Sequence, residues 1–312
     1  MTSKSQAVQN FTSWAVTNPL PGRHRRGAAH TISGYIGDIE LFANWHKETT
    51  GHDLSAETLT SDDIQDYVTY SLTVEKRKPN TILRRFAAIR AYCLYLMQAD
   101  DRITSDLTTG IRLPKKEIST KRGLRRKERL AVGRALAVPL KETLQGRQRF
   151  ARDKAIIFTM MYVGVRVEEL SNIKMQDITL RERSGSIRVL GKNEKERTAG
   201  IPSKARDPLR EWIRIRSEMG IEHEHLFTQV KRSLAPLKKR AIQYIVEETG
   251  KRAGLSEFKL TAHILRHTAV RVWRKETGDD RITAAQMGHS IATMQRYDAV
   301  AESDVMEAAS KF

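Results

Sequence analysis

The stretch GIRLPKKEISTKRGLRRKER, residues 110–129, divides this chain into two parts with different sequence patterns. It carries nine basic and two acidic residues, and the apolar periodicity of the preceding sequence stops over residues 115–121. Such a run is typical of a solvated segment between folded domains. We predict a helical domain over residues 1–111, a basic linker over residues 112–124 and a second domain over residues 125–312.

The part before the linker has the pattern of helices. Apolar residues recur at intervals of three and four after Thr31, Ser61 and Pro79, each of which can begin a helix. A shorter amphipathic stretch over residues 6–16 precedes them. The sequence therefore predicts four helices with basic outer faces. Three arginines on the last of them are expected to contact DNA: Arg84, Arg85 and Arg90.

The part after the linker mixes helices with a small sheet. Residues 186–190, SIRVL, alternate as in a strand, the polar GKNEKERT follows as a turn, and residues 199–202 are expected to return as a second strand. Amphipathic helices lie before and after, with breaks at Gly254, Gly278 and Gly288. The predicted fold is mainly α with a small β-sheet: a helical N-terminal domain and an α+β second domain.

Composition and charge indicate a polyanionic partner. The 312 residues include 55 Lys and Arg against 37 Asp and Glu, a formal net charge of +18, and the isoelectric point is near 10.1. Nucleic acid is the first candidate. A membrane is disfavoured because no apolar run approaches roughly 18 residues and the N-terminus lacks the layout of a signal peptide. The single cysteine excludes an internal disulfide, and the expected setting is a reducing cytoplasm.

Four separated segments carry side chains suited to one chemistry. They are GVRVEEL at 164–170, GKNEKER at 191–197, HILRH at 263–267 and MGHSIATMQRY at 287–297. In this order they resemble the catalytic pattern of the tyrosine recombinase (phage integrase) family. That pattern is an Arg in a G-x-R-x-x-E-L turn, a Lys in a β-hairpin, H-x-x-R, a G-H pair and a Tyr near the C-terminus. The resemblance covers about residues 125–312, and the N-terminal helices look more loosely like the family's core-binding domain.

The resemblance implies a group of residues that binds the phosphate to be cut. In-line attack on a phosphodiester puts extra negative charge on its non-bridging oxygens. Arg166 and Arg266, which are planar and permanently charged, would hold those oxygens with paired hydrogen bonds. His263 and His289 would donate further hydrogen bonds to the same phosphate.

The resemblance also implies an attacking group and a proton donor. Tyr297 would attack phosphorus and form a 3′-phosphotyrosine link, which a second DNA end can reverse without ATP. Lys192 resembles the general acid that protonates the leaving 5′ oxygen, and Lys195 in the same turn is the alternative. Glu169 is expected to hold an arginine or histidine in place, and His267 to be a packed structural residue. No metal or other cofactor is expected.

The spacing of the last two matched residues departs from the family pattern. Tyr297 follows His289 by eight residues, where the family usually has nine. One residue fewer would turn a helix by about 100°. We expect the loop at residues 290–292 to absorb this difference.

Double-stranded DNA with inverted-repeat sites and further copies of this chain are the predicted partners. Linker contacts to phosphates are expected from Lys115, Lys116, Lys121 and Arg122. A terminal helix over residues 300–312 has apolar character. It either folds back on its own domain or, as the resemblance implies, docks in a neighbouring subunit of a tetramer. The expected location is the nucleoid.

Two other functions remain open on the sequence. A type IB-like topoisomerase shares the chemistry but acts alone, so a requirement for two DNA sites and a tetramer would exclude it. A DNA-binding regulator without activity is disfavoured, because the five polar positions and Tyr297 are all present. The first helix is expected near residue 6, which leaves no room for an arm-binding domain. A simple recombinase of the Xer or transposon type is therefore expected.

Overall fold

The computed structural model describes residues 6–20, 29–100, 103–117, 122–139, 141–191, 196–230 and 234–290. The chain divides into two compact units, Met1–Ser119 and Thr120–Phe312. The division falls inside the segment expected to be the linker. Before it, the backbone N–H of Arg112 donates to Gln65 Oε1 at 2.8 Å within the first unit. After it, Leu124 is buried in the core of the second unit.

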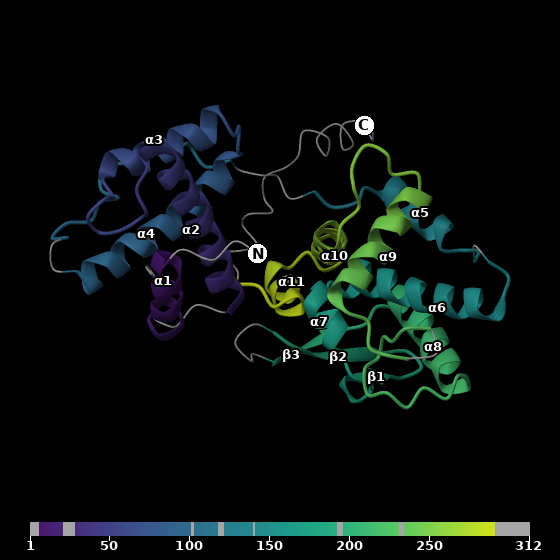
Figure 1. Ribbon diagram of the computed structural model, residues 1–312. Helices are drawn as coiled ribbons and strands as arrows, with labels where there is room; N and C mark the ends of the chain where they lie inside the picture. The colour runs from purple at the N-terminus through teal and green to yellow at the C-terminus, as the bar shows by residue number, and fades with distance from the viewer. Residues whose placement is uncertain are drawn as a thin grey trace, which may run out of the picture. The chain divides into compact units, whose positions relative to one another are not determined.

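The described part of the first unit is helical (Figure 1). Its helices are α1 (Gln6–Thr17), α2 (Ala29–Thr50), α3 (Ser61–Thr73) and α4 (Pro79–Ala99). Local chemistry explains where two of them begin. A capping box joins Thr60 and Asp63 at the start of α3, and Pro79 occupies the first turn of α4, where a missing N–H costs nothing. Helix α2 begins two residues before Thr31, the residue expected to cap it.

Aromatic side chains from all four of these helices contribute to the core of the first unit. Phe11 of α1 meets the edge of Tyr92 with 5.6 Å between ring centroids, and Phe42 of α2 lies 4.9 Å from Tyr67. Cys93 is fully buried in the same core. Burial raises the pKa of its thiol to about 12, so the thiol stays protonated and acts as a small core residue.

The second unit surrounds one larger core. Its helices are α5 (Arg126–Ala135), α6 (Leu144–Phe158), α7 (Val167–Asn172), α8 (Ser203–Glu218), α9 (Lys239–Arg252), α10 (Ala262–Thr277) and α11 (Asp280–Met287). A π-helical turn, η1 (Thr159–Val163), extends α6, and a 3₁₀ turn, η2 (Met175–Asp177), follows α7. Helix α10 packs against η1, and α6 packs against α8. The fully buried Trp212 of α8 donates to Leu226 O at 2.9 Å in the middle of this core.

A three-stranded antiparallel sheet lies beside these helices in the order β1 (Ile178–Leu180), β2 (Gly185–Leu190), β3 (Glu196–Gly200). In the register, Leu190 lies opposite Glu196 and Ser186 opposite Gly200. The return strand therefore begins three residues earlier than expected. Glu196 and Thr198 lie on the exposed face of this edge strand, and Arg197 between them is mostly buried. Strand β3 packs against α11 (Figure 1).

All three of the expected glycine breaks follow helices: Gly254 comes directly after Ala253, the C-cap of α9, and has a φ of +70°. Gly278 and Gly288 both adopt the left-handed conformation, with φ of +64° and +60°, and they cap α10 and α11. The fold expected from the sequence, mainly helical with one small sheet, is confirmed.

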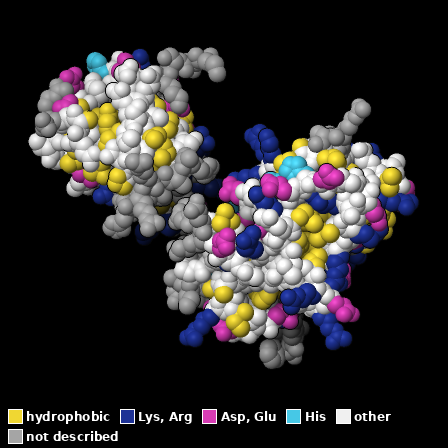
Figure 2. Space-filling view, turned by 90° about the horizontal axis from the view of Figure 1, so that it is seen from below, with side chains coloured by type: hydrophobic (Ala, Val, Ile, Leu, Met, Phe, Trp, Pro, Cys, Tyr) yellow, Lys and Arg dark blue, Asp and Glu magenta, His cyan; other side chains and the backbone are white. Residues whose placement is uncertain are grey.

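Charged side chains of both signs are mixed on the face of the larger unit that Figure 2 shows. Lys and Arg project around its edge, with Asp and Glu between them. None of the described helices is both long and apolar enough to cross a membrane.

Candidate active site

Arg166 is placed by the turn that joins η1 to α7. The turn passes through Gly164, whose φ is +81°, and a Cβ there would come 2.5 Å from Met287 Sδ, so only glycine fits. Arg166 then caps α7: its backbone N–H donates to Glu169 Oε2 at 2.8 Å and its Nη1 to Oε1 at 2.6 Å. The Arg166 side chain stays 40% exposed. Glu169 thus orients a guanidinium that still faces solvent.

Arg266 reaches the same carboxylate from α10. Its Nη1 donates to Gly164 O at 2.6 Å, its Nη2 donates to Met287 O at 2.5 Å, and Nη1 lies 3.7 Å from Glu169 Oε2. The side chain is only 6% exposed. Because a buried guanidinium needs acceptors for its N–H groups, these contacts fix its orientation. The structure therefore brings Arg266 and Arg166 together although 100 residues separate them.

Glu169 joins a third arginine to these two. Arg197 of β3 donates from Nη1 to Oε1 at 3.1 Å and from Nη2 to Oε2 at 2.9 Å. Burial of the Glu169 carboxyl would raise its pKa, but the hydrogen bonds from Arg197 and Arg166 outweigh burial and lower the pKa to about 2. Three guanidinium groups then share one carboxylate, so the cluster has a formal charge of +2. Such a preorganised cluster suits an anion.

Three successive carbonyls at the end of η1 accept hydrogen bonds from side chains of α10 and α11. A helix terminus leaves its last carbonyls without intrahelical partners, and here side chains supply the donors. The pairs are Trp273 Nε1 with Tyr162 O (2.7 Å), Gln286 Nε2 with Val163 O (3.0 Å) and Arg266 Nη1 with Gly164 O (2.6 Å). The turn that carries Arg166 is thereby fixed to the helix that carries Arg266.

The three histidines in these segments have different surroundings. His289 follows the cap of α11, and its Nε2 lies 2.8 Å from Arg266 Nη2. His263 is exposed in the first turn of α10. Its ring stacks on that of His267, with centroids 6.5 Å apart. The structure thus joins His289 to the arginine cluster and pairs His263 with His267.

The expected nucleophile and general acid, Tyr297 and Lys192, lie outside the described residues. So do Lys195, Lys121, most of the loop at residues 290–292, and residues 300–312. The structure does describe the paired strand ends Leu190 and Glu196 that flank both hairpin lysines. Within the described residues, no group of three His, Cys, Asp or Glu side chains could hold a metal ion.

Arg197 and Gln286, which the sequence did not single out, hold the arginine cluster at Glu169 in place. Arg197 Nε donates to Gln286 O at 3.2 Å. The Gln286 side chain accepts from Gly200 N at 2.8 Å and donates to Gly200 O at 3.0 Å. Together they attach the edge strand β3 to α11. Strand alternation from Glu196 could have placed Arg197 on the inner face, but no local pattern marks Gln286, whose partners are distant in sequence.

Arg85 does not lie on the outer face of α4, where the sequence predicted it. The residue is only 5% exposed. Its guanidinium contacts the Glu75 carboxylate, lies 3.3 Å from Ser71 Oγ, and stands 5.9 Å from the centroid of the Tyr67 ring. The outer-face position predicted for Arg85 is therefore wrong: its guanidinium is buried and paired inside the first unit and is not placed to contact DNA.

The two other arginines of α4 keep their guanidinium groups partly exposed. Arg84 pairs with the buried Asp38. Burial raises the pKa of Asp38 even though Arg84 acts to lower it. Arg90 lies 3.6 Å from Asp106. Both side chains are about half exposed, so each can also reach a phosphate.

The basic residues of the expected linker fall into two groups. Lys115 and Lys116 are exposed at the end of the first unit. Arg122 belongs to the second unit: its guanidinium stacks over the Phe258 ring at 3.7 Å and pairs with Glu128. The two lysines are therefore freer than Arg122 to contact a DNA backbone.

Comparison with known proteins places both units in one family of sequences. Residues 132–304 match the phage integrase family, and residues 23–100 match the N-terminal SAM-like domain of phage integrases. The tyrosine recombinase XerC of Caldanaerobacter subterraneus subsp. tengcongensis is 28% identical over 300 residues, which cover 90% of this chain and 81% of that protein. XerC of Staphylococcus haemolyticus is 28% identical over 276 residues, 88% of this chain and 87% of that protein.

Solved structures show the same fold at lower identity. The XerH site-specific recombinase in a post-cleavage complex with palindromic difH substrate superposes with a TM-score of 0.73 and 15% identity, covering 97% of this chain and 94% of that one. A lambda integrase dimer bound to a COC′ core site gives 0.69 at 17% identity, covering 93% and 76%. At these identities the likeness concerns the fold.

Proposed function

This chain belongs to the phage integrase family, and from that premise we propose that it is a site-specific recombinase that cuts and rejoins DNA through a 3′-phosphotyrosine link on Tyr297. The observation that carries the proposal is the meeting of Arg166 and Arg266 at Glu169, beside His289. Guanidinium groups held in this way can bind the non-bridging oxygens of one phosphate in pairs.

The positive cluster would act mainly on the transition state. When the Tyr297 oxygen attacks phosphorus, negative charge grows on the non-bridging oxygens, and fixed cations stabilise that charge without having to reorganise. Arg166 offers the more exposed guanidinium, whereas Arg266 is held by two carbonyls. His289, and His263 from the exposed start of α10, would donate to the same oxygens.

The 5′ oxygen needs a proton as it leaves. We assign this proton to Lys192, in the turn between β2 and β3, with Lys195 as the alternative in the same turn. The bond between phosphorus and the 5′ oxygen breaks as the bond to the Tyr297 oxygen forms. Attack by a 5′ hydroxyl of a second DNA end then reverses these steps and releases the tyrosine.

DNA affinity would come mostly from phosphate contacts outside the cluster. Arg84, Arg90, Lys115 and Lys116 expose their charged groups in the first unit, and Lys121 follows in sequence. Such contacts fix the protein on a duplex without reading its sequence. They would also keep a protein of charge +18 associated with the nucleoid.

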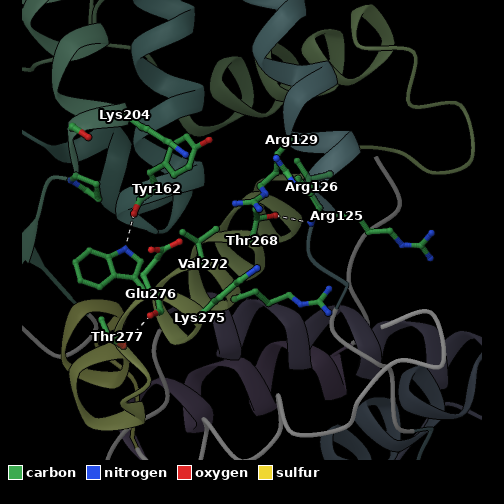
Figure 3. A pocket seen from close by; sticks show the side chains of 15 residues that line it. Arg125, Arg126, Arg129, Tyr162, Lys204, Thr268, Val272, Lys275, Glu276 and Thr277 are labelled. Atoms are coloured by element: carbon green, nitrogen blue, oxygen red, sulfur yellow. Dashed lines mark hydrogen bonds between the residues drawn. The ribbon is translucent and has the colours of Figure 1, made fainter. Parts of the chain in front are cut away.

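A basic pocket of the second unit would receive the terminal segment of a neighbouring copy. The pocket has a volume of about 790 Å³ and lies between α5 and α10. Lys204 stands beside the Tyr162 ring on one side, with Arg126 and Arg129 opposite (Figure 3). Its lining includes six basic residues against a single acidic one, Glu276. Residues 300–312 combine three acidic with several apolar side chains, so the same segment of a partner subunit complements this lining in charge.

The assembly proposal is tested by removing that segment. A chain ending at Ala301 should bind a single DNA site normally and lose the two-site complex and the recombinant product, because each interface of a closed ring loses the same contact. Full recombination by the truncated chain would contradict docking in a neighbour. Loss of single-site binding would instead assign the segment to the unit's own core.

The number of DNA sites used separates a recombinase from its closest rival. A topoisomerase of type IB would relax supercoiled DNA as a single copy. The proposed recombinase needs two sites, so the product should disappear when a plasmid carries one site. Relaxation of a plasmid without any site would favour the rival.

The central experiment uses Tyr297→Phe and a duplex nicked near the cut site. The short strand released on cleavage diffuses away, so wild-type protein should accumulate as a covalent adduct on gels. Tyr297→Phe should bind the duplex with near wild-type affinity and form no adduct, since the hydroxyl is a nucleophile and not an affinity contact. An adduct with the variant would refute the assignment. Tyr244→Phe, which alters an exposed tyrosine of the same unit, is the matched control and should react normally.

A further inference from the structure

All three nitrogen groups of the Arg197 side chain have a partner. Nη1 and Nη2 form a two-point contact with the Glu169 carboxylate, at 3.1 and 2.9 Å, and Nε donates to Gln286 O at 3.2 Å. The side chain is only 12% exposed. A guanidinium has a planar, rigid arrangement of donors that an ammonium group lacks. The position therefore requires the shape of arginine as well as its charge.

Arg197 sits where the hairpin meets the rest of the unit. Strand β3 pairs with β2 on one edge only. Its other side is attached to α11 through the Gln286 side chain, which bonds both backbone groups of Gly200. Arg197 provides a second attachment three residues earlier, next to the turn that carries Lys192.

The Arg197 side chain also packs against the turn that precedes His289. A Cβ on Gly288 would come 2.9 Å from Arg197 Cδ. The backbone N–H of His289 then bonds Ala284 O at 3.0 Å, which ties the residue to α11. One side chain thus joins the strand behind the hairpin turn, on which it lies, to the carboxylate that holds Arg166 and to the turn before His289.

We infer that Arg197 is a positioning residue of the cleavage reaction: it fixes Glu169, and through it Arg166, to the strand behind the general-acid turn and to the turn before His289. The inference rests on the proposed function. Arg197 acts through these neighbours and not on DNA, because its nitrogen atoms are occupied within the protein. Its loss should misplace the phosphate-binding groups more than it weakens DNA binding.

The pH dependence of cleavage distinguishes positioning from simple stabilisation. The charged groups that face Glu169 are Arg166 from α7, Arg197 from β3 and Arg266 from α10. Without Arg197, burial of the carboxyl is opposed by fewer hydrogen bonds and the pKa of Glu169 rises. A protonated Glu169 holds Arg166 less well, so the acid side of the rate profile should move to higher pH. A residue that only stabilised the fold would leave that profile unchanged.

Arg188 is the matched control in the neighbouring strand. It lies on β2 and contacts Asp177 Oδ1 through Nε at 3.1 Å and Nη2 at 2.8 Å. This pair resembles the one between Arg197 and Glu169 but is more exposed. The variants to compare are Arg197→Met, Arg197→Lys, Arg188→Met and Arg188→Lys. The probe is a nicked duplex carrying the inverted-repeat site recovered by selecting bound sequences from random DNA.

Three quantities are measured for each full-length variant: single-turnover adduct formation from pH 3 to 9, affinity for the duplex, and the melting temperature. Arg197→Met should slow adduct formation by about ten- to a hundredfold, keep affinity within about threefold of wild type, and shift the acid limb upward by about one pH unit. Arg197→Lys should lie between it and wild type. Both Arg188 variants should match wild type in rate and profile.

The role of Arg197 is overturned if wild type forms the adduct and Arg197→Met reacts equally fast with an unchanged profile. It is also overturned if the Arg188 variants are equally impaired. Should Arg197→Met fail to fold, the profile of Arg197→Lys decides in the same way. Absence of any adduct from wild type would instead overturn the proposed function, on which the inference depends.

Discussion

Arginines in the two units of this chain are used differently. In the first unit Arg84 pairs with Asp38, and the buried Arg85 pairs with Glu75, which the half-exposed Arg77 also contacts. In the second unit, Arg166, Arg197 and Arg266 meet at the single carboxylate of Glu169. In the first unit the buried guanidinium of Arg85 is balanced by one carboxylate and Arg77 stays half exposed, whereas the cluster in the second unit has a formal charge of +2.

This difference in charge balance distinguishes an arginine that stabilises the fold from an arginine that can bind a phosphate. A balanced buried pair satisfies its own charges and has little to offer a further anion. A cluster with surplus positive charge, fixed by carbonyls and β-strand contacts, becomes balanced when a phosphate with growing negative charge enters. The comparison predicts that replacing the buried Arg85 of the first unit changes stability, and that replacing an arginine of the cluster at Glu169 changes the reaction rate.

The largest expected effects follow loss of Arg166 or Arg266. Arg166→Ala and Arg266→Ala should each slow adduct formation by about a hundred- to a thousandfold or more, the cost of removing a fixed donor from a transition state. Affinity should fall only a few times, since most phosphate contacts lie elsewhere. Arg188→Ala, which removes a surface guanidinium of the same unit, serves as control. Equal losses of rate and affinity would contradict the transition-state role.

Replacement of Lys192 should give a comparable defect with a different chemical signature. Lys192→Ala should slow cleavage by about a hundredfold or more, as expected for a general acid. When sulfur replaces the bridging 5′ oxygen, the leaving group departs without protonation. This substrate should therefore restore the cleavage rate of Lys192→Ala. The same substrate should not rescue Arg166→Ala. Rescue of Lys195→Ala in place of Lys192→Ala would move the general acid to Lys195.

In the first unit, loss of the buried pair between Arg85 and Glu75 should lower the free energy of unfolding and leave the rate of DNA cleavage unchanged. Arg85→Met leaves the Glu75 carboxylate without its strongest partner and should cost about 3 kcal/mol of unfolding free energy. The adduct rate at saturating protein should stay within about twofold of wild type. Chemical denaturation and the nicked-duplex assay measure the two quantities. A large loss of rate with unchanged stability would remove the distinction between the units.

The sequence predicted the fold class, because helical and strand periodicity can be read along the chain. It also predicted that Arg166, Arg266 and His289 belong to one site, because each lies in a local motif. It did not reveal Arg197 or Gln286 as supports. Their partners lie 28 to 123 residues away, and such contacts leave no local pattern. The sequence also assigned Arg85 to an outer face. Arg85 is buried by Tyr67 on α3 and by Glu75 in the segment just after α3, and helical spacing within α4 cannot show these neighbours.

A smaller effect is expected from acid titration of the cluster. The pKa of Glu169 is lowered from 4.5 to about 2 in the folded chain. A lowered carboxyl pKa stabilises the fold fully above pH 4.5, and this contribution is lost as the pH falls toward 2. It amounts to at most about 3 kcal/mol. The difference in unfolding free energy between wild type and Glu169→Gln should therefore shrink between pH 5 and pH 3. A difference independent of pH would contradict the low pKa.

The central claim, that Tyr297 carries the DNA during cleavage, has one direct test. The trapped adduct is digested with a nuclease and then with trypsin, and the peptides are analysed by mass spectrometry. Trypsin cuts after Arg296 and Lys311, which releases YDAVAESDVMEAASK, residues 297–311, with Tyr297 as its only tyrosine. The account predicts a nucleotide attached to Tyr297 in this peptide. A nucleotide on any other peptide, with residues 297–311 unmodified, would contradict it.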